Sequence, residues 1–207
     1  MTRTICILNN GDEAQHLAAF LRQQSGQVEI TIGRTQADLG KIIDQTSGRV
    51  RLISFVSDLI IPRRTLDALA LTPYNIHPGP PEYPGSHPES WAIWEGARSY
   101  GVTAHEITQR VDSGAIVATS RFDMPGAPER LSLNETIFSE AVKVFAVIGM
   151  HCVRSDDDLP HMPITWSGRK RTKKDFAWLC HQFDQVAIEN RDRLAAACGP
   201  DLIRSAA

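Results

Sequence analysis

Cysteine is scarce in this chain of 207 residues, and its four copies are far apart, at Cys6, Cys152, Cys180 and Cys198. Since no Cys-x-x-Cys pair occurs, we expect neither a disulfide framework nor a zinc site, and we predict no bound metal. An excess of one charge is also lacking, because 22 Lys and Arg residues face 24 Asp and Glu residues, leaving a net charge of −2. This balance argues against a nucleic-acid partner and against a polybasic membrane binder.

Long hydrophobic runs are missing as well. No continuous stretch approaches the roughly 20 apolar residues that span a bilayer. The first ten residues contain one apolar run, Ile5 to Leu8, which is shorter than the core of a secretory signal. Hydrophobic residues make up 42% and charged residues 22%, an ordinary globular composition. We therefore expect a soluble, cytoplasmic protein with no membrane partner.

Strand and helix patterns alternate along the first part of the chain. Strands are predicted at Thr4–Leu8, Val28–Ile32, Val50–Val56 and Thr72–His77, and two more at Val102–Ile107 and Ala115–Phe122. Helical patterns separate the first four strands, which indicates a parallel sheet covered on both faces. The predicted fold class is α/β, with a contracted Rossmann-like, mostly parallel sheet.

Two Ser-x-x-Glu capping boxes predict where later helices begin. Ser86 and Glu89 would open a short helix, and Ser132 and Glu135 a long one. A last helical segment, from about residue 175 to 197, gives the fold a helical C-terminal tail. Because no internal repeat or low-complexity linker occurs, we predict a single domain over residues 1–207, with an α/β core at 1–155 and a C-terminal extension at 156–207.

The segment TPYNIHPG places two chemically useful side chains at the end of a predicted strand. Asn75 and His77 are two residues apart, so both project from the same face of the strand. Pro78 cannot continue the ladder, so the strand opens into a loop there. Because ligands bind beyond the carboxyl ends of strands in open α/β sheets, this amide and imidazole are candidate site residues. Alternatively, they satisfy backbone groups of the loop.

A carboxylate follows in the turn Asp112-Ser113-Gly114. An Asp in such a turn is usually a turn former. In one crevice with Asn75 and His77, however, Asp112 would complete a set of complementary groups. The amide and imidazole can donate to an oxyanion, while the carboxylate orients the imidazole and accepts a proton.

These motifs together resemble a known enzyme family. The segments NIHPGPPEYPG and GVTAHEITQRVDSGAIV are similar to the formyltransferases that use 10-formyltetrahydrofolate, in which an Asn-x-His-Pro strand end precedes a Gly-Val-Thr strand and an Asp-x-Gly loop. The similarity covers about residues 50–123 and extends weakly into TWSGRKRTKKDFAWL. The loop Gly79-Pro80-Pro81 is closer to the formyl-handling domain of a hydrogenase maturation factor.

The resemblance implies formyl transfer from 10-formyltetrahydrofolate to an amine of a small molecule. Asn75 and His77 would stabilise the oxyanion, and Asp112 would hold His77 and collect the amine proton. The resemblance also implies folate contacts, which we assign to Leu59, Ile60, Ile61, His105, Ser113 and Gly114. For His105, a packed strand histidine is the alternative.

The acceptor is open among amino sugars, amino acids and hydroxylated amines. The resembled family includes a purine-synthesis branch, whose members hold a substrate phosphate with a glycine-rich first loop. The first predicted turn here, residues 9–12, has only one glycine and also an acid that would repel a phosphate, which argues against this branch for the chain. The basic cluster at 169–174 is either a contact for a phosphorylated or nucleotide-linked acceptor or a hydrated surface. Two other functions stay open: a hydrolase that uses water as the acceptor, and a folate-binding protein without catalytic activity. A homodimer is also open.

Overall fold

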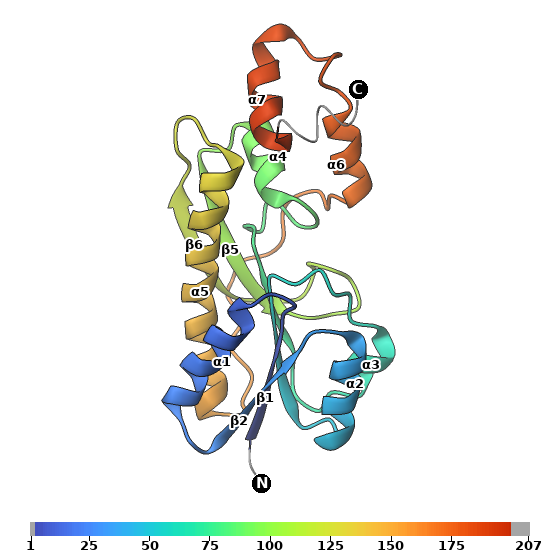
Figure 1. Cartoon of the computed structure of the whole chain (residues 1–207), viewed down its shortest axis with the longest axis vertical. Coiled ribbons are helices and arrows are strands. Elements are labelled where there is room, and N and C mark those ends of the chain that lie inside the picture. Colours follow the sequence, from blue (N-terminus) through green and yellow to red (C-terminus); the bar gives the residue numbers. More distant parts are fainter. Residues whose placement is uncertain (1–2, 200–207) are drawn as a thin grey trace.

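A mixed six-stranded sheet runs through the computed structural model, which describes residues 3–199 (Figure 1). Its order is β2-β1-β3-β4-β5-β6. The first four strands in this order form three parallel pairs, whereas β5 is antiparallel to both β4 and β6. The predicted α/β class is therefore confirmed. The strands are β1 (Arg3–Leu8), β2 (Val28–Gly33), β3 (Val50–Phe55), β4 (Tyr74–His77), β5 (Ser99–Glu106) and β6 (Ile116–Asp123).

Helices cover both faces of the sheet and one end of it (Figure 1). They are α1 (Glu13–Gln24), α2 (Gln36–Gln45), α3 (Arg63–Asp67), α4 (Pro88–Glu95), α5 (Arg130–Arg154), α6 (Lys173–Cys180) and α7 (Ile188–Cys198). Helices α1 and α5 lie on one face, and α2 and α3 on the other. Helices α4, α6 and α7 gather beyond the end of the sheet, around their own small apolar cluster.

The alternation of side chains along each strand separates two cores. In β1, Ile5 and Ile7 belong to the core under α1 and α5, whereas Cys6 and Leu8 belong to the core under α2. In β4, Tyr74 and Ile76 are buried in the α5 core. Because neighbouring residues of a strand point to opposite faces, Asn75 and His77 both project on the α2 side, and they share one face as the sequence predicts.

Helix α5, with 25 residues, is the longest helix in the part of the chain that the structure describes. Within residues 3–199 it alone is long and apolar enough to cross a membrane, with a mean hydropathy of 1.5 over 18 residues. The sequence had led us to expect no such segment. Its inner side chains, including Ile137, Phe145 and Ile148, are buried against the sheet, so it serves here as a core helix.

Both predicted capping boxes are wrong. Helix α4 begins after His87, and the Glu89 carboxylate pairs with Arg130 at 3.2 Å instead of closing a box. Helix α5 begins before Ser132, whose hydroxyl donates to the carbonyl oxygen of Glu129. Capping boxes are found instead at Thr35–Asp38 and Thr172–Asp175, with the shorter Asp as the third residue after the cap. The last predicted helix is two helices, α6 and α7.

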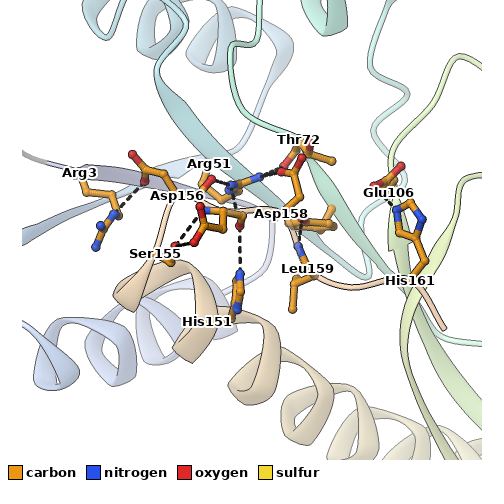
Figure 2. A network of polar contacts seen from close by, with 12 residues as sticks. Arg3, Arg51, Thr72, Glu106, His151, Ser155, Asp156, Asp158, Leu159 and His161 are labelled. Atoms are coloured by element: carbon orange, nitrogen blue, oxygen red, sulfur yellow. Dashed lines mark hydrogen bonds and ion pairs between the residues drawn. The ribbon is translucent and has the colours of Figure 1, made fainter.

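A buried arginine ties the chain after α5 to the sheet (Figure 2). The Arg51 side chain, in β3, is 1% exposed, and its guanidinium donates to the carbonyl oxygens of Thr72 and Asp156. It also pairs with the carboxylate of Asp158 at 3.0 Å. Arg3 pairs with Asp156 at 2.8 Å. The acidic segment 156–158, which follows α5, thus accepts hydrogen bonds from two arginines of the sheet.

Candidate active site

The pairing of β4 with β5 places three polar side chains on one face of the sheet. The antiparallel register sets Asn75 opposite His105 and His77 opposite Thr103. The Asn75 amide nitrogen lies 3.1 Å from Nε2 of His105, and Nδ1 of His105 lies 2.8 Å from the Glu106 carbonyl oxygen. His105 therefore donates from Nδ1 to this carbonyl oxygen and accepts at Nε2 from the Asn75 amide. The second N–H of the amide stays available to a ligand.

His77 is fixed by the loop that follows it. Its Nε2 lies 2.9 Å from the Tyr83 carbonyl oxygen and donates to it, so the neutral ring leaves Nδ1 unprotonated. That nitrogen faces Oδ2 of Asp112 at 3.6 Å, beyond hydrogen-bond distance. The ring is 4% exposed, and this burial lowers the pKa of His77 below 6.5. His77 is therefore a neutral imidazole at pH 7.

Asp112 lies between the two imidazoles. Its Oδ1 is 3.4 Å from Nε2 of His105, and its Oδ2 accepts from the backbone N–H of Gly85 at 2.8 Å. Burial alone would raise the pKa of this carboxyl, but the positive charge that the rings of His77 and His105 carry when protonated, together with the N–H of Gly85, outweighs burial and lowers the pKa to about 2. Asp112 itself has a left-handed backbone, with φ of 49°. The result is a buried, ionised carboxylate beside two ring nitrogens that can take a proton.

These groups border a cavity of about 600 Å³, a size typical of small-molecule sites. Its lining includes Asn75, His77, His105 and Asp112. The apolar segment Leu59 to Ile61, which follows β3, forms another part of the wall. Four of the polar residues selected from the sequence therefore meet at one cavity with the predicted apolar segment.

Two predicted folate contacts lie apart from this cavity. Ser113 is exposed, and its hydroxyl donates to the carbonyl oxygen of Arg110. Gly114 is buried and packs against the end of β5, where a Cβ would lie 1.9 Å from the carbonyl oxygen of Glu106. Neither residue is among those that line the cavity. Both shape the turn that carries Asp112.

The basic cluster, by contrast, reaches the cavity. Lys170, Arg171 and Lys173 are part of its lining, as is Arg110 from the turn after β5. Lys173 pairs with Asp58 across the cavity mouth at 3.0 Å. Within residues 3–199, no group of three His, Cys, Asp or Glu side chains is arranged to hold a metal ion. The mouth of the site is thus cationic and its floor carries the Asn, His and Asp set.

Comparisons with known proteins give a family model and a curated relative that this chain resembles. Residues 52–144 match the family model described as formyl transferase. A methionyl-tRNA formyltransferase from Bifidobacterium longum is 28% identical over 87 residues, which is 42% of this chain and 26% of that protein. The chain thus matches about a quarter of that relative's length.

Solved structures match almost the whole chain. A sugar N-formyltransferase from Shewanella sp FDAARGOS_354 has a TM-score of 0.75 at 17% identity, over 95% of this chain and 88% of that one. HypX from Aquifex aeolicus in complex with tetrahydrofolic acid has a TM-score of 0.68 at 18% identity, over 97% of this chain and 35% of that one. Residues 52–144 therefore match the formyl transferase family model, and the described chain has the fold of the formyltransferases that it resembles.

Proposed function

We propose that the protein is an enzyme that transfers the formyl group of 10-formyltetrahydrofolate to an amine on a small acceptor. The observation that carries this proposal is the meeting of Asn75, His77 and Asp112 at one cavity. A free amide N–H, a neutral imidazole and a buried carboxylate are the groups that acyl transfer to an amine needs. The family match at residues 52–144 covers all three residues.

The reaction needs stabilisation of negative charge and a path for one proton. As the amine nitrogen attacks the formyl carbon, the carbonyl electrons move onto oxygen, and the free N–H of Asn75 donates to that oxyanion. The amine proton passes first to the Asp112 carboxylate, which relays it to the unprotonated Nδ1 of His77 beside it. The imidazolium so formed adds positive charge near the oxyanion. When the bond from the formyl carbon to N10 of the folate breaks, the proton returns to N10, so the enzyme is regenerated.

The cavity wall suggests where each substrate lies. Leu59, Ile60 and Ile61 present an apolar surface suited to the flat pterin, and we assign His105 to the same end of the site. The cationic mouth formed by Arg110 and Lys170 suits an acceptor with an anionic group, such as a phosphate. We therefore favour a phosphorylated or nucleotide-linked amine, which includes amino sugars, over a free amino acid. Reduced cysteines are typical of the cytoplasm, which we propose as the compartment.

Mass spectrometry of formylated products tests this proposal. The purified protein is incubated with 10-formyltetrahydrofolate and a panel of amines, with and without phosphate groups. Product is expected with the wild type, and Asn75→Ala should lower kcat roughly 100- to 1000-fold, the effect of losing one oxyanion donor. Formate release without any amine would indicate a hydrolase, and folate binding with no loss of formyl would indicate a binding protein. Unchanged turnover in Asn75→Ala would contradict the proposed site.

A further inference from the structure

The C-terminal extension returns to the site after its anchor at Arg51. Backbone hydrogen bonds tie it to strand β6 and to the loop that follows β4. Met162 N–H donates to the Ile116 carbonyl in β6, and Ser167 N–H donates to the Pro81 carbonyl. Arg171 N–H donates to the Pro84 carbonyl and its own carbonyl accepts from Ser86, so residues 162–171 follow the loop after β4 closely.

Two glycines make this close approach possible. A Cβ at Gly85, where φ is 99°, would lie 2.0 Å from the Arg171 carbonyl oxygen. A Cβ at Gly168 would lie 1.6 Å from the Glu82 carbonyl oxygen. Both contacts are backbone against backbone and cannot be relieved by moving a side chain. The loop that follows His77 and the extension are therefore shaped to fit each other.

Trp166 is the side chain that the extension contributes to the imidazoles. Its ring centroid lies 5.0 Å from that of His105 and 5.7 Å from that of His77, with interplanar angles of 87° and 69°. These are favourable edge-to-face arrangements. Its Nε1–H donates to the carbonyl oxygen of Gly114 at 2.9 Å, in the turn that carries Asp112. One indole thus contacts both histidines and the backbone beside the carboxylate.

We propose that Trp166 is a positioning residue, which holds the rings of His77 and His105 and the Asp112 turn in the arrangement that formyl transfer requires. This inference rests on the proposed function and extends it, because the site is then incomplete without the extension. The indole excludes water from one side of the imidazoles, which are only 4% and 3% exposed. Its hydrogen bond to Gly114 stabilises a turn in which Asp112 has a positive φ.

Three variants of the full chain test whether Trp166 positions the imidazoles and the Asp112 turn. Trp166→Leu removes both the ring and the donor, and Trp166→Phe keeps a ring but removes the hydrogen bond to Gly114. Trp178→Leu is the matched control, because Trp178 belongs to the same extension but is 61% exposed on α6. Folding is checked by circular dichroism and thermal melting, and each variant is assayed for kcat and KM with an amine that the mass-spectrometry assay shows to be formylated.

Trp166→Leu is expected to lower kcat roughly 10- to 100-fold, as small misplacements of reacting groups do. Trp166→Phe should fall between it and the wild type, and Trp178→Leu should match the wild type. Nitrogen-15 NMR of the imidazoles gives a readout that needs no turnover. In Trp166→Leu, water reaches His77, so its titration should move upward toward that of an exposed histidine.

The NMR readout separates this inference from the proposed function. If no amine is ever formylated, the proposed function fails, but a shifted imidazole titration in Trp166→Leu alone still supports the positioning role. If Trp166→Leu folds and both kcat and the imidazole titrations equal those of Trp178→Leu, the inference is overturned. Should Trp166→Leu not fold, the same comparison between Trp166→Phe and Trp178→Leu decides.

Discussion

The Asp112→Asn variant tests the charge at the centre of the site. Asn has the shape of a protonated Asp and can still accept from the N–H of Gly85, so the change removes charge and leaves the packing. Lowering the pKa of a carboxyl from 3.8 to about 2 corresponds to roughly 2 kcal/mol of folding free energy at pH 7. We therefore expect Asp112→Asn to be about 2 kcal/mol less stable than the wild type, or about 4–8 °C in Tm for a chain of this size.

The pH dependence of this difference identifies its origin. A group whose pKa is lowered by folding stabilises the protein above its unfolded pKa, and loses that effect as the pH falls through its folded pKa. For Asp112 the window lies between 3.8 and about 2. The free energy of unfolding, measured by urea titration at pH 7, 5, 4 and 3, should thus decline more steeply for the wild type than for Asp112→Asn. Asp44→Asn, at an exposed position on α2, is the control.

Activity should respond far more than stability. Without a carboxylate to take the amine proton, kcat should fall roughly 100- to 10,000-fold at pH 7, where both proteins are still folded. A stability difference near zero at pH 7, or one that does not change between pH 5 and pH 3, would show that Asp112 is not the buried, ionised acceptor described above. Retained kcat would refute its catalytic role independently.

Three further substitutions test the surroundings of the site. Gly85→Ala forces a Cβ against the Arg171 carbonyl and displaces the N–H that Asp112 accepts from, so both Tm and kcat should fall, measurable by thermal melting and steady-state assay. Arg51→Met removes the guanidinium that donates to the carbonyl oxygens of Thr72 and Asp156, and urea titration should show a loss of about 1–3 kcal/mol in the free energy of unfolding. Lys170→Ala should raise KM for an anionic acceptor severalfold, an effect that diminishes at high salt, whereas KM for an uncharged acceptor should not change.

The order of strands and helices was predictable because the core imposes strict patterns. Alternation in β1 and helical spacing in α2 follow from the need to bury one face of each element. The positions of helix ends were less predictable, since side chains near them have competing partners. Glu89 has the spacing of a capping box, but it is buried beside Arg130, and the ion pair takes the carboxylate that the cap would have used.

The candidate catalytic residues could be named from the sequence because their types and order carry chemical meaning. Their exact relations could not, since these depend on strand register. Both β4 and β5 were expected, but only their antiparallel pairing sets His105 opposite Asn75 and makes it the acceptor of the amide. The same pairing leaves Asp112 between two imidazoles, whereas the sequence suggested a single one.

The sequence pattern does not indicate that Trp166 belongs to the site. Trp166 ends a short apolar piece, residues 163–166, that precedes the basic cluster at 169–174. This segment has no helical or strand period, and more than fifty residues separate Trp166 from Asp112. Its place becomes clear only when three independent contacts are combined: the anchor at Arg51, the backbone fit between Gly168 and Glu82, and the indole against the two rings. A polar site on a sheet face stays exposed to water unless another segment covers it. In this fold the covering segment is also the one that carries Lys170 and Lys173, so the same stretch of chain that shields the imidazoles brings positive charge to the mouth of the cavity. Shielding of the reacting groups and recognition of an anionic acceptor are therefore coupled through one segment.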